Sequence, residues 1–162
     1  MENTNPHVIK SVDIDFKCLP KLKKDIVLWR GIPEYHPLKT TYLKNLYKII
    51  ESLKKGDIYV NRAYMYGAVE KDIAESFRHN WHEEGLLIKM NIPEGAQVSL
   101  TNFEGIMPRY SKWICLNNEP IKDGHLIELQ YVLPEDRVIK HSFKNNIKIF
   151  INSIKNTCKS VW

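Results

Sequence analysis

One short apolar run ends in an arginine, and that arginine constrains the fold more than any other feature of the sequence. The run Asp25–Trp29 has strand length, and Arg30 follows it before Gly31 and Pro33. Because an unpaired internal charge is costly, the guanidinium needs a carboxylate or an anionic ligand. We expect either an internal ion pair at a strand end or a grip on an anion, for which phosphate suits the guanidinium fork best. Gly31 would let such a ligand approach the backbone.

The amino-acid composition and the length of the chain are typical of a single folded domain. The chain has 162 residues, of which 43% are hydrophobic and 27% charged, which argues against disorder. The net charge is +5, and the lysines are spread along the chain. This charge favours an anionic ligand or partner but falls short of a nucleic-acid-binding signature. We expect residues 1–24 to be an arm or an edge strand and residues 25–162 to be a single domain, and we expect the chain to act as a monomer.

The cysteines and the N-terminus bear on the compartment. Three scattered cysteines without a Cys-x-x-Cys pair indicate reduced thiols, and the first residues lack the pattern of a signal peptide. No apolar run approaches the roughly 20 residues of a membrane helix. The expected location is the cytoplasm, or outside the producing cell by a route without a classical leader. His79 and His82 lack partners for a zinc site, so no metal is expected.

Periodicity predicts helices early and late, with strands clustered in the middle and second half. The first predicted helix begins at Thr40 or Thr41 and ends at Gly56. A second predicted helix covers Glu70–Trp81, and a third covers the tail Phe143–Trp162. The predicted strands are Asp25–Trp29, Asp57–Val60, Leu86–Asn91, Gln97–Leu100, Leu126–Leu133 and Arg137–His141. In the second helix, Val69, Ile73, Phe77 and Trp81 should form the apolar face. This order predicts an α+β fold with a largely antiparallel sheet.

Two further segments carry candidate chemistry. Tyr64 and Tyr66 are two residues apart on an extended stretch, so they point the same way and are either an aromatic wall for a flat ring or ordinary core or rim aromatics. Glu128 and Gln130 share one face of a strand whose other face is apolar. That polar face is either exposed to solvent or lines a cleft.

Taken in order, these segments resemble the ADP-ribosyltransferase fold of bacterial toxins and effectors, in its arginine–serine–glutamate branch. Leu28–Gly31 is similar to the family's early strand ending in Arg-Gly, and Glu128–Pro134 to its late Glu-x-Glu strand before a proline. The resemblance implies a single domain with a split, mostly antiparallel sheet and flanking helices. It further implies that NAD is the substrate, that Arg30 and Gly31 bind it, and that Tyr64 or Tyr66 packs on its nicotinamide.

The chain departs from that pattern at two places. Arg62–Tyr66 stands where the family has a Ser-Thr-Ser turn, and Gln130 stands at the position of the catalytic glutamate. Glu128 then matches the upstream position that orients the acceptor, although a shift of two residues would make Glu128 catalytic. Glutamine can accept a hydrogen bond from the ribose but supplies no negative charge to an oxocarbenium-like centre. Either Glu128 takes over the catalytic role, or turnover of NAD is weak.

The sequence therefore predicts a mono-ADP-ribosyltransferase that uses NAD and modifies a macromolecule, with a protein the favoured acceptor and a bacterial effector or toxin the favoured context. Glu128 and Gln130 are its candidate catalytic residues. One alternative is a weak or inactive NAD-binding or protein-interaction module on the same fold. Another is a transferase acting on nucleic-acid ends, for which the basic surface would matter.

Overall fold

The computed structural model describes residues 6–34, 41–79 and 85–134. The described part holds three helices and eight strands, whose bounds are α1 Pro6–Cys18, β1 Ile26–Pro33, α2 Thr41–Glu51, β2 Ile58–Asn61, β3 Met65–Ala68, α3 Lys71–His79, β4 Gly85–Ile92, β5 Ser99–Leu100, β6 Glu104–Met107, β7 Ser111–Ile121 and β8 Gly124–Val132. None of these helices is long and apolar enough to span a membrane. The predicted strand over 137–141 and the predicted helix over 143–162 lie outside the described residues.

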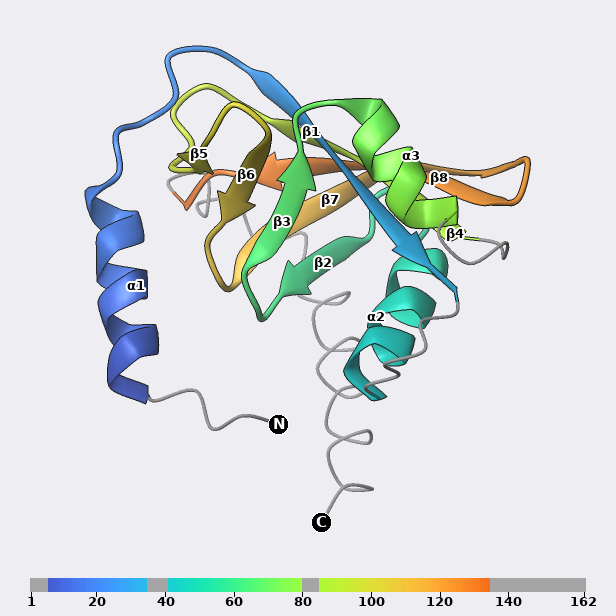
Figure 1. Ribbon diagram of the computed structural model, residues 1–162, viewed down its shortest axis with the longest axis horizontal. Coiled ribbons are helices and arrows are strands. Elements are labelled where there is room, and N and C mark those ends of the chain that lie inside the picture. The colour runs from blue at the N-terminus through green and yellow to red at the C-terminus, as the bar shows by residue number, and fades with distance from the viewer. Residues whose placement is uncertain (1–5, 35–40, 80–84, 135–162) are drawn as a thin grey trace.

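The eight strands form one sheet in the order β2-β7-β8-β4-β1-β3-β6-β5. Every neighbouring pair is antiparallel except β4 with β8, which run parallel. Figure 1 shows α2 and α3 on one side of the molecule and α1 on the other, near β5 and β6. The predicted α+β class and the largely antiparallel sheet are both confirmed.

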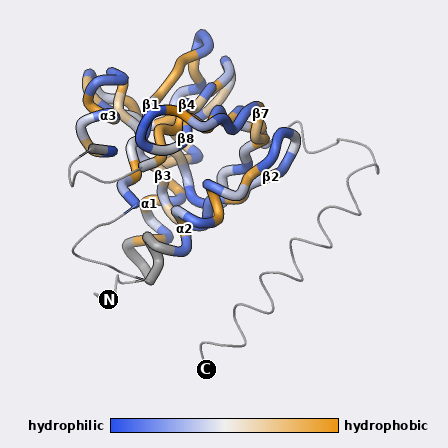
Figure 2. The backbone as a smooth tube through the Cα atoms, turned by 90° about the vertical axis from the view of Figure 1, so that its right-hand side faces the viewer, coloured by the Kyte–Doolittle hydropathy of each residue, from blue (hydrophilic) through white to orange (hydrophobic). Residues whose placement is uncertain are grey.

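The three central strands, β1, β4 and β8, separate an apolar face from a polar one. Residues paired across neighbouring strands point to the same side of a sheet. Leu28 pairs with Met90, and Ile88 pairs with Ile127, so these residues share what we call the core face. Figure 2 shows hydrophobic stretches gathered where the three strands meet. Helix α2 packs on the core face, where its buried residues Leu46, Tyr47 and Ile50 join the main cluster together with Leu53, which follows the helix.

Helix α3 covers part of the opposite face. A Cβ added to Gly31 would lie 2.0 Å from the carbonyl oxygen of Ala74, so the helix backbone rests directly on β1. Ala74 is buried, whereas Val69 and Phe77 are exposed. The predicted apolar face of this helix is therefore wrong at Val69 and Phe77, because close packing at a glycine selects the small residue of the helix rather than its large ones. Ile73 is partly buried, and Trp81 lies outside the described residues.

Residues Pro6–Cys18 form the helix α1, so the edge strand expected around residues 12–16 is wrong there. Ile9, Val12 and Phe16 are spaced at i, i+3 and i+7, which places them on one face of a helix. Phe16 is the buried residue of that face. The alternation of apolar residues at 12, 14 and 16 suits a strand equally well, but Ile14 is half exposed on α1.

Several boundaries also differ from the predicted ones. Strand β1 does not stop at Arg30 but continues through Gly31 to Pro33, paired throughout with β4. Strand β1 pairs with β3 at Trp29 and Ala68, so at Pro33 the strand pairs with β4 alone among the described strands. Because the other side of the strand is unpaired there, the backbone N–H that proline lacks costs the sheet little stability. Helix α2 ends at Glu51, before the predicted end at Gly56.

Three strands were not predicted. Strand β3 occupies part of the expected tyrosine turn, and β6 and β7 complete the sheet. Strand β7 is the longest in the described part, at 11 residues, but it contains two asparagines and a proline that obscure its period.

Arg78 links α3 to the turn between β7 and β8. Its side chain is 5% exposed, and its Nε donates to Glu75 Oε2 at 2.8 Å. Its Nη1 donates to the carbonyl oxygens of Lys122 and Asp123 at 3.2 and 2.8 Å. The carbonyl of Asp123 also accepts from the backbone N–H of Gly85. The guanidinium thus satisfies carbonyls of a tight turn beside the first residue of β4.

We predict that Arg78→Ala lowers the free energy of unfolding by about 3 kcal/mol, because it strips a buried network of its donor. The matched control is Lys71→Ala, which removes a second cation 3.7 Å from Glu75 that is 49% exposed. That loss should stay below about 1 kcal/mol. Urea denaturation of both variants provides the measurement, and similar losses in the two would contradict the role given to Arg78.

Candidate functional site

Glu128 lies at the centre of the polar face, held by two residues of the parallel neighbour β4. Its Oε1 accepts from Lys89 Nζ at 2.9 Å and from Asn91 Nδ2 at 2.7 Å. The Lys89 and Glu128 side chains are 34% and 29% exposed. Among the described residues, none donates to the other carboxylate oxygen, Oε2. The hydrogen bond from Lys89, followed by that from Asn91, holds the pKa of Glu128 below its usual value.

Gln130 lies on the same face, two residues further along β8. It pairs with Asn91 on β4 and with Ile114 on β7. Its Nε2 donates to the carbonyl oxygen of the adjacent Tyr131 at 3.3 Å. The apolar alternation that predicted this face is confirmed, because Ile127, Leu129 and Tyr131 are all buried. Glu128 and Gln130 are only partly buried, so the polar face remains accessible to solvent.

Arg30 lies on the other face of the sheet from Glu128. It pairs with Ile88, and Ile88 pairs with Ile127, so the guanidinium leaves β1 on the core face. Glu128 instead pairs with Lys89, which pairs with Trp29. Arg30 is partly exposed although its strand neighbours on that face, Leu28 and Ile32, are buried. The structure therefore does not bring the arginine and the acidic strand together on one face.

Gly31, the other predicted binding residue of β1, is already covered. The close backbone approach that its missing side chain allows is that of Ala74 in α3. A ligand at this point would have to displace the helix. Trp29, on the same face, has the ammonium of Lys71 at 5.5 Å from its ring.

The two tyrosines have different surroundings. Tyr64 stacks on Phe16 of α1, with ring centroids 5.5 Å apart, and its hydroxyl donates to Asp13 Oδ1 at 2.9 Å. Burial and then the hydrogen bond to Asp13 raise its pKa. Tyr66 is 50% exposed. Of the predicted aromatic wall, Tyr66 is open to a ligand, whereas Tyr64 serves to hold α1.

Sequence reasoning missed the residues that surround the predicted site. Lys89 and Asn91 show the same i, i+2 polar spacing on β4 as Glu128 and Gln130 on β8, and this shared period was the available signal. The ion pair of Asp13 with Arg109 had no such signal, because the two residues lie 96 positions apart in the chain. Its short contact joins Arg109 Nη2 to Asp13 Oδ2.

We predict that the Glu128 carboxyl titrates below its usual range and that Lys89→Met raises its pKa toward the ordinary value. Because the folded-state pKa is lowered, the stabilisation is present above the unfolded value of about 4.3 and is lost as the pH falls through the folded value. Carboxyl NMR titration measures this midpoint. Lys112→Met, which removes another lysine of the polar face, is the control and should leave the midpoint unchanged. An unshifted midpoint in Lys89→Met would refute the pairing.

Comparison with known proteins identifies the fold. No family model matches the chain, and no curated protein matches it in sequence. Solved structures do match. Plx2a, an ADP-ribosyltransferase toxin from Paenibacillus larvae, is 18% identical with a TM-score of 0.56, over 82% of this chain and 74% of that one. The Vis toxin, an ADP-ribosyltransferase from Vibrio splendidus, is 16% identical with a TM-score of 0.57, over 83% of this chain and 59% of that one.

A third match is the C3 exoenzyme of Clostridium limosum, 14% identical with a TM-score of 0.55, over 77% of this chain and 67% of that one. The chain thus spans about three fifths to three quarters of these proteins. At such low identity the likeness is one of fold and carries no residue role by itself. The resemblance inferred from Arg30 and the Glu128 strand is confirmed at that level: the protein has the ADP-ribosyltransferase fold.

Proposed function

We propose that the protein is a NAD-dependent mono-ADP-ribosyltransferase that modifies a macromolecular acceptor, for which a protein is the favoured class. The fold carries this proposal: its matches include the ADP-ribosyltransferase toxins Plx2a and Vis, and each of these covers about four fifths of the chain. The order of Arg30 on β1 and Glu128 with Gln130 on β8 supports it further. We place the enzyme among bacterial toxins or effectors, cytoplasmic in the producer or delivered to another cell without a classical leader.

In the proposed reaction, the bond between nicotinamide and its ribose breaks through an oxocarbenium-like centre. The Arg30 guanidinium would neutralise the NAD diphosphate, and the exposed ring of Tyr66 would pack on nicotinamide. A carboxylate that accepts from the ribose hydroxyl stabilises the cationic centre. Glu128 is the negatively charged group of β8, and no described residue donates to its Oε2. Gln130 would accept a hydrogen bond at the neighbouring position without adding charge.

The acceptor is proposed to approach the polar face. The Glu128 carboxylate already binds the ammonium of Lys89, so this position tolerates a cation. One of the structurally similar proteins, Vis, is known in complex with agmatine, a small guanidinium compound. Agmatine is therefore a suitable first acceptor for transfer assays, next to protein mixtures.

A second candidate function has its own support. Arg30 and Glu128 occupy opposite faces, Glu128 is paired with Lys89, and Gln130 lacks a charge. These features favour a module that binds NAD with little turnover. Saturable NAD binding without nicotinamide release would support this candidate over the transferase.

We predict that Arg30→Ala lowers kcat/KM for nicotinamide release from NAD by about a hundredfold or more, because it removes a charge-assisted contact to the diphosphate. Arg30→Lys should retain part of the activity, since it keeps the charge but loses the fork. Release of labelled nicotinamide and transfer of labelled ADP-ribose are the readouts. Equal activity in wild type and Arg30→Ala would overturn the assignment.

Substitutions at the two candidate positions on β8 are expected to change nicotinamide release in opposite directions. Glu128→Ala should lower nicotinamide release by about a hundredfold if Glu128 stabilises the ribose cation. Gln130→Glu should raise it by a similar factor if Gln130 occupies the catalytic position, because it restores the missing charge. Glu119→Ala, on exposed β7, is the control. If neither Glu128→Ala nor Gln130→Glu changes nicotinamide release, both residues are excluded from the proposed mechanism.

A further inference from the structure

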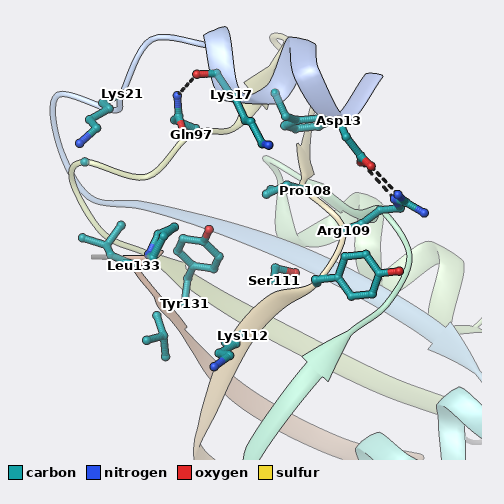
Figure 3. A pocket seen from close by; sticks show the side chains of 15 residues that line it. Asp13, Lys17, Lys21, Gln97, Pro108, Arg109, Ser111, Lys112, Tyr131 and Leu133 are labelled. Atoms are coloured by element: carbon teal, nitrogen blue, oxygen red, sulfur yellow. Dashed lines mark hydrogen bonds and ion pairs between the residues drawn. The ribbon is translucent and has the colours of Figure 1, made fainter. Parts of the chain in front are cut away.

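A cavity of about 520 Å³ lies beneath the C-terminal half of α1, away from the residues proposed to act on NAD. Its walls come from α1, from the loop at Gly95 and Gln97, and from the adjoining ends of β7 and β8. Neither Arg30 nor Glu128 lines it. Figure 3 shows the Lys17 side chain running from α1 into this space, with the Tyr131 hydroxyl directed toward the helix. The volume suits a ligand of nucleotide size.

The wall formed by α1 is fixed in place by several contacts. Asp13 accepts from Arg109 Nε at 3.0 Å and from the Tyr64 hydroxyl, while Phe16 stacks on the Tyr64 ring. At the end of α1, Gln97 Nε2 donates to the carbonyl oxygens of Lys17 and Leu19 at 2.9 and 2.8 Å. Those carbonyls carry the negative end of the helix dipole, and the amide that satisfies them reduces their repulsion of an anion.

The charge of the lining is strongly positive. Among the described residues, the ionisable side chains of the lining other than tyrosine are four cations and one carboxylate, namely Lys17, Lys21, Arg109, Lys112 and Asp13. The carboxylate is already engaged by Arg109, which holds the pKa of Asp13 below its usual value. Low-dielectric walls lined by one sign of charge concentrate an ion of the opposite sign. The cavity therefore favours an anion, and several lysines around it favour a phosphate over a single carboxylate.

The rim adds a surface for a planar ring. Tyr110 is 57% exposed, and the Arg109 guanidinium lies 5.3 Å from its ring centroid. Its backbone has a φ of 59°, in the left-handed region that bulky residues rarely adopt. Such strain persists only where the surroundings enforce it, and it gathers at ligand sites. An exposed aromatic next to a cationic cavity matches a nucleotide, with its base on the ring and its phosphate on the lysines.

We propose that this cavity is a binding site for a nucleoside phosphate, separate from the NAD-binding residues and beyond the proposed transferase function. The nucleoside base stacks on Tyr110, and the phosphate groups contact Lys17, whose side chain enters the cavity (Figure 3). NAD and free nucleotides share this chemistry, so the experiment must distinguish these two sources. It does so by using ADP and pyrophosphate as probes and by including Arg30→Ala.

The test is calorimetric titration of the full chain with ADP and with pyrophosphate. Lys17→Glu should weaken both probes about tenfold or more, whereas Lys55→Glu, the same change on an exposed turn, should have no effect. Tyr110→Ala should weaken ADP but not pyrophosphate. Arg30→Ala removes the proposed contact to the NAD diphosphate, and the ADP binding that remains in this variant should still be weakened by Lys17→Glu. Thermal melting checks that each variant folds.

Wild-type protein supplies an independent readout that needs no variant. On addition of ADP, the backbone amide NMR signals of Lys17, Gly95 and Lys112 should move, and those of Lys89 and Glu128 should not. The proposal is overturned if ADP does not bind, if Arg30→Ala abolishes ADP binding while Lys17→Glu preserves it, or if Tyr110→Ala leaves ADP affinity unchanged. Binding of single-stranded RNA without binding of ADP would also overturn it, in favour of a nucleic-acid surface.

Discussion

The parallel pairing of β4 with β8 is the constraint on which the rest of the structure depends. It joins two apolar strands at the centre of the sheet, and its register decides which side chain faces the core and which faces solvent. At its start, a Cβ on Gly124 would lie 1.9 Å from the carbonyl oxygen of Gly85, so the strands begin in a contact that only glycine permits. Because side chains alternate along a strand, a slip of one residue would exchange the two faces.

That register explains which residues of the candidate site lie together on the polar face and which lies on the core face. Glu128 meets Lys89 and Asn91 because all three lie on the polar face, and the ion pair follows from the pairing rather than from a dedicated pocket. The same alternation sends Arg30 to the core face. The fold therefore presents Arg30 and the Glu128 strand in the order along the chain that prompted the resemblance, whereas the sheet places the arginine and the carboxylate on opposite faces.

Local signals account for what the sequence predicted. The buried strands β1, β4 and β8 are continuous or alternating apolar runs, and Glu128 with Gln130 shows its face by period alone. The helix beginning at Thr41 follows from one apolar stripe. These features depend on residues close together in the chain, so a single sequence suffices to find them.

Long-range packing accounts for what the sequence did not predict. Whether residues 12–16 form a strand or a helix is settled by Asp13 bonding Arg109 and Tyr64, far along the chain. Helix α3 turns Ala74 and Arg78 inward because Gly31 and the β7–β8 turn lie beneath it. The cavity under α1 also arises from segments that meet only in the folded chain, so no local pattern indicates it.

A structure of the protein with NAD tests most directly the proposal that this fold binds NAD through Arg30. We expect the NAD diphosphate to lie within hydrogen-bonding distance of the Arg30 guanidinium. The same structure would show which side chain of β8 meets the nicotinamide ribose. NAD bound without contact to Arg30, for example in the cavity under α1, would contradict this proposal, as would no bound NAD at saturating concentration.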